Sequence, residues 1–452
     1  MNTRAITKLQ AAIIVVIVVI AILGAVYYYL TTTTSTTQGP PAPDSIKIGW
    51  VAPLTGGAAA HAKPVPWVAQ KMKEAINKEG GIYLAEYGKK IPVDIILKDC
   101  QSDSSISASV AADLITKDGV HLLIATFTPA FVLPAVTQAE KYGVPCLSSM
   151  CPILSWAEGG PYEWTFNVHY AENIMIESQV KLINSLISKT NGVIGTLYRN
   201  DVDGIKFYNI FRDRIDANRV PYTKIVHPGF HDVNTKDFGS VIQQFKAEGV
   251  EIVIGNSGTT EFNAFWTQSQ ELGFKPKYFI SSRGFNTYTQ IKTLGGDLPL
   301  GIMCEWHWSR ELPFKSSITG QSASEWADLY EQENNEFYQA SIGFLHTLFE
   351  IAVDAFTRAG TVDREKVRDA IAETDLDTIF GHIKFKKAIP TDLQPLFANY
   401  PGVVTMKEHW HSVPVFIGQW VRGTKWDWEN VIVYNMFKDV SVTVHEPIPT
   451  GG

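Results

Sequence analysis

The pattern of hydrophobic and polar positions divides the chain into an apolar N-terminal run and a long body of alternating segments. Residues 11–30 read AAIIVVIVVIAILGAVYYYL, without a charged side chain. A helix of this length rises about 30 Å, which matches the hydrocarbon core of a bilayer. We therefore predict that residues 1–30 form a transmembrane anchor or a signal segment.

The charged residues around this run set its predicted orientation. Arg4 and Lys8 precede it, and no acidic or basic residue follows before Asp44. The positive-inside rule then keeps the N-terminus in the cytoplasm and places the rest of the chain outside. A cleaved signal peptide is the alternative, but its apolar core is usually only about 7–15 residues long. We expect a helix anchored in the cell membrane, with the soluble part extracellular.

A segment of low complexity follows the apolar run. Threonines fill most of positions 31–37, and prolines stand at positions 40, 41 and 43. This composition offers no core-forming side chains and favours an extended chain. We predict a stalk over residues 31–45, and a separate C-terminal tail over residues 441–452.

From residue 46 onward, short apolar runs alternate with amphipathic stretches. The first series predicts strands at 46–51, 91–99, 121–126 and 144–149, separated by helices at 66–78, 106–118 and 134–142. A second series predicts helices at 173–189, 204–218, 238–248 and 260–272, alternating with strands at 192–198, 223–230, 251–256 and 277–282. Such alternation predicts an α/β protein whose parallel sheets are covered by helices on both faces.

The pattern changes after Gly301. A long helical segment is predicted over 325–359, with a break near Asn334, and another helix over 364–373. The tail from Gly381 onward is strand-like and rich in tryptophan. The two α/β series predict two doubly wound sheets, whose ligands bind beyond the carboxyl ends of the strands. A ligand cleft between the two units follows from this arrangement.

Composition and motifs remove several classes of function. The net charge is -7 and no basic patch carries interleaved aromatic residues, so we expect no nucleic-acid partner. Four cysteines (Cys100, Cys146, Cys151 and Cys304) form neither a disulfide framework nor a zinc spacing, although one long-range disulfide stays open. GxSxG, HExxH and dinucleotide-binding motifs are absent from the sequence. We therefore expect no enzyme activity, no catalytic residue, no metal and no cofactor.

Several motifs resemble type I periplasmic binding proteins. KIGWVAPLTGGAA, followed by a helix ending in INKEGGI, resembles the family's first strand, loop and helix. VDIILKDCQSDSSISASVAADLITKDGVHLLIATFTPA resembles its second strand, helix and third strand, and AEKYGVPCLSSM the next helix and strand. IFGHIKF and VFIGQWVRG resemble the C-terminal part. Their order and spacing, from residue 46 to about 434, resemble the leucine/isoleucine/valine-binding subgroup of ABC importers.

The resemblance implies two lobes joined by three crossings of the chain. The N-terminal lobe would comprise residues 46–166 plus 300–379, and the C-terminal lobe residues 167–299 plus 380–440. A ligand would lie between the lobes, which close over it by hinge motion. The closed form would then dock on permease subunits of an ABC importer, which must be other chains.

Matching the family's loops onto this sequence gives the expected ligand contacts of the first lobe. His61 falls where relatives often have an aromatic residue, although a solvated surface histidine is the alternative. Phe127 and Thr128 lie in a loop that in relatives offers hydroxyl and N–H groups to a carboxylate. For the residues at and after the strand at 144–149, simple packing of the strand end is the alternative to ligand contact. The expected contacts are Thr55, Gly56, His61, Phe127, Thr128, Ser148, Ser149, Met150 and Cys151.

The second lobe departs from the family pattern. Asp203 stands where members often have a tyrosine, and Arg283 stands at or next to the acid that binds an α-ammonium group. Because arginine favours carboxylates, the resemblance then points toward an organic acid. Alternatively, Asp203 binds the ammonium group or simply pairs with Arg283. Ser257 follows the strand at 251–256 and completes the expected contacts there.

The sequence CEWHWSR lies at a predicted crossing between the lobes. Trp306 and Trp308 share one face of an extended segment, with Glu305 and His307 on the other. Trp306 is the expected cleft contact, and hinge packing is the alternative. Taken together, these patterns predict the extracellular substrate-binding component of an ABC importer for an amino acid or small organic acid. A membrane-tethered sensor with the same fold is the second hypothesis, and an extracellular α/β enzyme the third.

Overall fold

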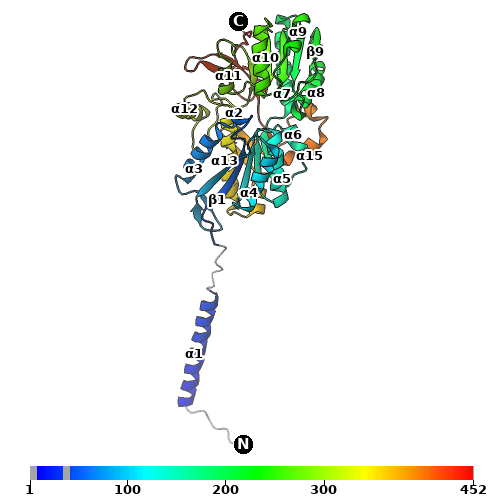
Figure 1. Cartoon of the computed structure of the whole chain (residues 1–452). Coiled ribbons are helices and arrows are strands. Elements are labelled where there is room, and N and C mark those ends of the chain that lie inside the picture. The colour runs from blue at the N-terminus through cyan, green and yellow to red at the C-terminus, as the bar shows by residue number, and fades with distance from the viewer. Residues whose placement is uncertain (1–7, 34–40, 451–452) are drawn as a thin grey trace.

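The structure is a computed structural model that describes residues 8–33 and 41–450. Two α/β lobes stack on each other (Figure 1), with α3, α4 and α5 in the lower lobe and α8, α9 and α10 in the upper. Arg4, residues 34–40 of the predicted stalk and residues 451–452 of the predicted tail lie outside the described residues. The remaining chain confirms the predicted fold class of two doubly wound sheets.

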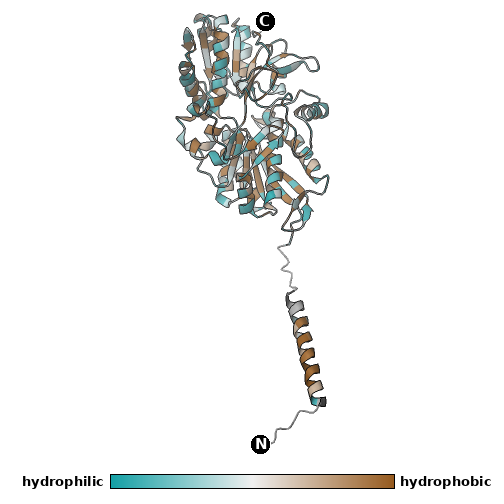
Figure 2. Ribbon diagram, turned by 180° about the vertical axis from the view of Figure 1, so that it is seen from behind, coloured by the Kyte–Doolittle hydropathy of each residue, from teal (hydrophilic) through white to brown (hydrophobic). Residues whose placement is uncertain are grey.

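The N-terminal apolar run forms helix α1 (Lys8–Thr33). Its window Gln10–Tyr28 is long and apolar enough to cross a membrane, and none of that window is buried. Figure 2 shows this helix coloured mostly hydrophobic, whereas the ribbon of the lobes mixes hydrophobic and hydrophilic colours. A signal sequence near the N-terminus also satisfies this test of length and hydropathy, so whether the helix is retained stays a prediction.

The first lobe is built on a six-stranded parallel sheet in the order β15-β7-β6-β5-β1-β4. Helices pack on both faces, so the central strands β5 and β6 are buried throughout. Its strands are β1 (Ile46–Ala52), β4 (Val93–Asp99), β5 (Leu122–Thr126), β6 (Cys146–Ser149), β7 (Thr165–His169) and β15 (Trp410–Ser412). Its helices are α2 (Ala59–Ala62), α3 (Val65–Asn77), α4 (Ser104–Thr116), α5 (Pro129–Tyr142), α6 (Ile153–Ala157), α12 (Ala323–Asn334), α13 (Ser341–Ala359), α14 (Arg364–Ala372) and α15 (Pro401–Thr405).

The second lobe has a seven-stranded sheet in the order β17-β16-β12-β11-β10-β8-β9. The last two strands are antiparallel to their neighbours, and the others are parallel. Its strands are β8 (Val193–Tyr198), β9 (Lys224–Val226), β10 (Ile252–Asn256), β11 (Tyr278–Ser282), β12 (Met303–Trp306), β16 (Phe416–Arg422) and β17 (Trp428–Tyr434). Its helices are α7 (Glu172–Leu186), α8 (Val202–Ala217), α9 (Gly239–Ala247), α10 (Thr259–Glu271) and α11 (Tyr288–Leu294).

Two short hairpins and three 3₁₀ turns complete the described elements. The hairpins are β2 (Ile82–Leu84) with β3 (Lys89–Ile91), and β13 (Asp375–Thr378) with β14 (Gly381–Lys384). The turns are η1 (Ile187–Lys189), η2 (Gln394–Phe397) and η3 (Lys407–His409). All four cysteines are free and buried, so the disulfide that the sequence left open is absent from the structure.

Strand order shows that the chain passes between the two sheets three times, after β7, after β12 and after β15. All three predicted lobe boundaries differ from this path. Asn167–His169 was placed in the C-terminal lobe but belongs to β7 of the first sheet, so the first crossing comes after residue 169. Met303–Trp306 belongs to the second sheet, because β12 pairs with β11 and β16, so the crossing comes after residue 306 rather than at 300. Trp410–Ser412 was placed in the C-terminal lobe but pairs in parallel with β7 of the first sheet. A strand of three residues shows no periodicity that sequence reasoning can use.

One close contact holds the second crossing, the segment that follows β12, against α13. Trp308 is fully buried, and its indole N–H donates to the carbonyl oxygen of Ile379 over 3.0 Å. The ring lies flat against Gly343, where a Cβ atom would stand only 2.3 Å from Trp308 Cγ. Only glycine leaves this space, so the contact fixes where the crossing leaves the first lobe.

We therefore expect Gly343→Ala to lower the free energy of unfolding by about 1–3 kcal/mol, the usual range for overpacking a core. Chemical denaturation of the purified soluble part measures this change. Gly402→Ala is the matched control, because nothing lies within 4 Å of the added methyl group there. Equal stability of the two variants would contradict the proposed role of the contact between Trp308 and Gly343.

Candidate functional site

The carboxyl ends of both sheets face each other across a small pocket between the lobes. Its volume is about 10 Å³, roughly the space of one water molecule, so the lobes are closed on each other. Any larger ligand requires the lobes to separate first. The lining side chains come from both lobes and the crossings between them: His61, Phe127, Met150, Asn286, Thr287, Glu305, His307, Gln339, Ala340 and Ser341.

Strained backbone marks the loops around this pocket. Phe127 and Thr128 follow β5 with φ angles of 70° and 60°, and Met150 follows β6 with φ of 56°. Arg283 and Phe285 follow β11 with φ of 69° and 63°. Left-handed conformations at non-glycine residues cost about 1–3 kcal/mol each and gather at functional sites. Their concentration in these loops supports a binding role for the pocket.

A buried carboxylate, Glu305 at the end of β12, lies at the centre of the site. Its Oε2 accepts a hydrogen bond of 2.8 Å from the hydroxyl of Tyr170, a residue of the first lobe. Its Oε1 accepts from the backbone N–H of Arg283 at 3.1 Å and the side-chain amide of Asn286 at 3.2 Å. Burial alone would raise the pKa of Glu305, but these bonds and His307 outweigh it and hold the pKa below its usual value. Glu305 is therefore ionised near neutral pH.

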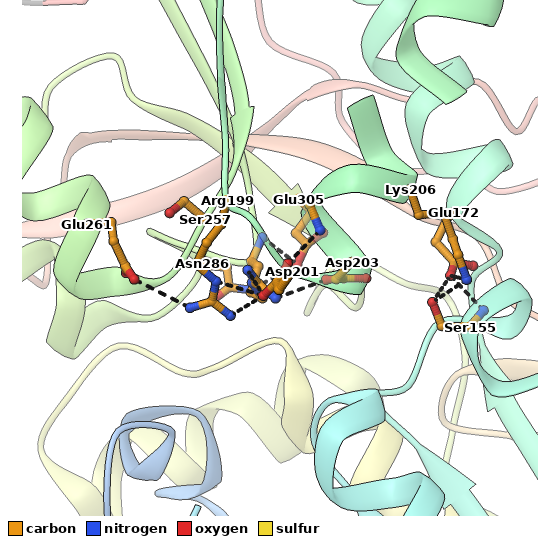
Figure 3. Close-up of polar contacts among 12 residues, drawn as sticks. Ser155, Glu172, Arg199, Asp201, Asp203, Lys206, Ser257, Glu261, Asn286 and Glu305 are labelled. Atoms are coloured by element: carbon orange, nitrogen blue, oxygen red, sulfur yellow. Dashed lines mark hydrogen bonds and ion pairs between the residues drawn. The ribbon is translucent and has the colours of Figure 1, made fainter. Parts of the chain in front are cut away.

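Next to Glu305, two arginines and two aspartates form a network within the second lobe (Figure 3). The guanidinium of Arg283 contacts Asp201 at 3.1 Å and Asp203 at 3.3 Å. Arg199 contacts the same Asp201 at 2.5 Å and Glu261 at 3.5 Å. Arg283 lies beside the pocket rather than in its lining, and both of its terminal nitrogens bind carboxylates of its own lobe. The pairing of Asp203 with Arg283 is the alternative that the sequence left open.

Burial and pairing act in opposite directions on the two aspartates. Burial raises the pKa of Asp203 above its usual value, although Arg283 opposes this shift. For Asp201, burial is outweighed by Arg283, by the N–H of Gly204 and by Arg199, which together lower its pKa. Together with Glu261 and Glu305, these two aspartates make four carboxylates, against the two guanidinium groups of Arg199 and Arg283. The second-lobe wall of the cleft is therefore acidic.

His61 reaches across the cleft from α2. Its Nε2 lies 3.3 Å from the side-chain amide of Gln290 on α11, so this contact joins the two lobes. Burial lowers the pKa of His61 to about 4, which leaves the ring neutral near pH 7. A neutral ring can accept a hydrogen bond from Gln290, which a protonated ring cannot.

A second interlobe contact lies at the edge of the cleft (Figure 3). Lys206 of α8 contacts Glu158 at 2.7 Å, the hydroxyl of Ser155 at 2.9 Å and Glu172 at 4.0 Å. Glu172 is fully buried and accepts from two backbone N–H groups of α6. Burial raises the pKa of Glu172, and Lys206 is the cation that opposes this shift.

The structure brings some of the predicted residues to the pocket and leaves others away from it. His61, Phe127 and Met150 line the pocket, and Thr128 lies beside them. Asp203 and Arg283 lie in the adjacent network. The remaining predicted contacts are engaged elsewhere: Thr55, Gly56, Ser148, Ser149, Cys151, Ser257 and Trp306.

The physical reasons differ among these residues. Thr55 lies in an exposed turn, where its hydroxyl donates to Asp99 at 2.6 Å. Ser148 and Ser149 are buried on β6, with their hydroxyls donating to carbonyls of the adjacent strand β7. Trp306 is buried and packs edge-on against Trp420 at 5.6 Å between ring centroids. Hinge packing, the alternative reading of Trp306, therefore describes its surroundings.

Sequence reasoning missed several residues that line or support the pocket. Glu305 and His307 carried a usable signal, because they alternate with two tryptophans in CEWHW and had to face the other way. Tyr170 and Asn286 follow ends of strands, Gln339 precedes α13 and Ser341 begins it, without any local pattern. Only the folded chain brings them together.

The interlobe contact of Lys206 gives a direct test of closure. Lys206→Met removes the cation between Glu158 and Glu172 while keeping the side-chain length. Because a hydrogen bond to a charged group contributes about 1.5 kcal/mol, we expect the closed-to-open ratio to fall roughly tenfold. Small-angle X-ray scattering would show this as a larger radius of gyration. Lys224→Met, which breaks a pair with Glu248 inside one lobe, should leave the radius unchanged.

Comparison with known proteins adds sequence relatives. A Leu/Ile/Val-binding protein homolog from Brucella abortus is 23% identical over 57% of this chain, and the match spans 63% of that relative. The chain thus matches just under two thirds of that relative's length. A leucine-, isoleucine-, valine-, threonine- and alanine-binding protein from Pseudomonas aeruginosa is 21% identical over 76% of this chain and 86% of the relative.

Solved structures show the same fold. The branched-chain amino acid transporter substrate-binding protein LivJ from Streptococcus pneumoniae, in complex with isoleucine, superposes with a TM-score of 0.70 at 18% identity. That match covers 86% of this chain and 99% of LivJ. A solute-binding protein of an ABC transporter from Rhodopseudomonas palustris, in complex with 3,4-dihydroxybenzoic acid, gives 0.64 at 17% identity, over 90% and 99%.

The family itself is shown by a match over most of the chain. The sequence profile described as periplasmic binding protein covers residues 45–395. This range covers most of both lobes, the pocket between them and the first two crossings, after β7 and after β12. The chain therefore belongs to the periplasmic binding protein family, whose members bind solutes rather than catalyse reactions.

Proposed function

We propose that this chain captures an amino acid between its lobes outside the cytoplasm and delivers it to the permease of an ABC importer. The observation that carries the proposal is the ionised carboxylate of Glu305, buried at 4% exposure beside a pocket that both lobes enclose. Relatives named for leucine, isoleucine and valine binding support the class of ligand. Binding and lobe closure, rather than chemistry, are the mechanism.

The charges of the cleft favour a ligand with an ammonium group. Four carboxylates surround two guanidinium groups on the second-lobe wall, so an added cation would balance that wall better than an added anion. Arg283 is occupied by Asp201 and Asp203, which removes the main support for a ligand held only through its carboxylate. A small organic acid remains the second candidate, because displacement of Asp203 would free one nitrogen of Arg283.

The opposite side of the pocket suits the carboxylate of an amino acid. Ser341 begins α13 and lines the pocket, with a buried hydroxyl that has no hydrogen-bond partner in the structure. The N-terminus of a helix carries a partial positive charge, and α13 is 19 residues long. The ammonium group would then face Glu305 while the carboxylate faces α13.

A ligand screen tests the proposal. We expect zwitterionic amino acids to raise the melting temperature of the purified protein, because a ligand of the folded state stabilises it by mass action. Glu305→Gln should weaken binding about 100-fold in calorimetry, since it removes a buried charge partner of the ammonium group. Glu365→Gln on exposed α14 is the matched control. Equal binding of carboxylates that lack an amino group, unaffected by Glu305→Gln, would contradict the proposal.

The lowered pKa of Glu305 predicts how affinity depends on pH. A depressed carboxyl pKa means that the charge persists above the usual glutamate value of about 4.3 and is lost only below it. Affinity for an amino acid should therefore stay level from pH 8 to about pH 5 and fall below about pH 4. Calorimetric titration across this range measures the dependence, and a fall already near pH 6 would contradict the role of Glu305.

The proposal also covers the fate of the N-terminal helix α1. We infer that α1 is retained and tethers the lobes to the membrane, because its apolar run exceeds the core of a usual signal peptide. Mass spectrometry of the mature protein from the membrane fraction should detect the tryptic peptide that spans residues 9–47. A mature N-terminus close to Ala25 would show cleavage instead.

A tethered sensor of the same fold is the second candidate function. If the protein fails to stimulate transport by the reconstituted permease, that result would favour the sensor.

A further inference from the structure

A second cavity, much larger than the pocket of the cleft, lies elsewhere between the lobes. Its volume is about 850 Å³, within the range of roughly 300–1,000 Å³ that small-molecule sites occupy. It shares no lining residue with the cleft pocket. The proposed function therefore makes no use of it.

Parts of both lobes and of the C-terminal segment enclose this cavity. The second lobe contributes Ile174 and Glu177 of α7 and Arg214 of α8. The first lobe contributes β14 and β15, and residues 387–397 between them cover one side. Residues 436–440, which follow β17, complete the wall. A molecule held here would contact both lobes at once.

The walls are mainly aromatic and aliphatic. Five aromatic rings from five separate segments face the cavity: Phe314, Phe380, Phe397, Trp410 and Phe437. Phe397 and Trp410 stack at 5.7 Å between ring centroids, with planes 17° apart, so this part of the wall is ordered. Ile383, Ile389 and Leu393 add aliphatic surface. Ring-bearing ligands gain most from such walls, because flat apolar surfaces bury large areas in stacked contact.

The charged groups at the rim carry a small positive excess. Glu177 is matched by Arg214 at 2.7 Å and Lys181 at 3.3 Å. Lys387 and Lys438 stand with Asp392 and Asp439, so the lining holds four cations and three carboxylates. His411 lies buried below Lys387, and burial lowers its pKa to about 4, so it adds a neutral polar ring. An anionic group is the charge that this rim accommodates best.

We propose that this second cavity, which we call the rear cavity, is a binding site for an amphipathic anion with an aromatic body, such as an aryl carboxylate or sulfonate. The ring system would lie between Phe397, Trp410 and Phe380. The acidic group would lie near Lys387. The site is distinct from the cleft and takes a different class of ligand.

Fluorescence titration with 1-anilinonaphthalene-8-sulfonate tests the proposal on the full chain. The expected result is saturable binding of one probe per protein. Lys387→Glu should raise the dissociation constant about tenfold, because it replaces attraction by repulsion at the rim. Leu393→Trp should abolish binding, because the larger side chain fills the space between the rings. Lys275→Glu, an exposed lysine outside the cavity lining, should leave the constant unchanged.

Two outcomes would overturn the proposal. Binding that is equal in wild type, Lys387→Glu and Leu393→Trp would place the probe outside the rear cavity. Equal affinity for the neutral analogue 1-anilinonaphthalene would remove the anionic requirement. Lys387 is exposed, so its substitution keeps the test valid even where Leu393→Trp fails to fold.

Discussion

The buried carboxylate of Glu305 is the constraint around which the two lobes are arranged. A charge inside a protein must be paired or fully hydrogen-bonded, because its desolvation otherwise costs several kcal/mol. Glu305 meets this requirement with donors from both sides of the cleft, Tyr170 from one lobe and Arg283 and Asn286 from the other. In the closed lobes, groups from both therefore satisfy this charge together. Under the proposed function, separation of the lobes would take the Tyr170 hydroxyl from Glu305, and the ammonium group of a ligand would take its place.

Backbone strain and tight packing support the same arrangement from two sides. The strained residues after β5, β6 and β11 hold the loops of the cleft in a conformation that ordinary loops avoid. Trp308 against Gly343 fixes the crossing just beyond Glu305 and His307. This crossing begins at β12 of the second lobe, ends at α12 of the first and starts beside Glu305 and His307, which line the pocket. Under the proposed function, hinge motion would bend this segment and so would be coupled to ligand binding.

Local patterns in the sequence were sufficient for the α/β units and insufficient for the site. Strands 122–126 and 252–256 are buried throughout and open with three apolar residues each, and Gly143 ends α5 in the left-handed conformation, so their positions could be predicted closely. Glu305 and His307 could be placed opposite Trp306 and Trp308 by alternation. The partners Tyr170 and Asn286 lie 135 and 19 residues from Glu305, and nothing local links them. The pairing of Arg283 with Asp201 beside the pocket joins residues 82 positions apart, which no local pattern could choose among the open alternatives.

A crystal structure of the protein with a bound amino acid would locate the ligand's charged groups. We expect the ligand's ammonium nitrogen within hydrogen-bonding distance of a Glu305 carboxylate oxygen, with Arg283 still paired to Asp201. A ligand whose carboxylate is bound by Arg283, with no cationic group near Glu305, would contradict this expectation.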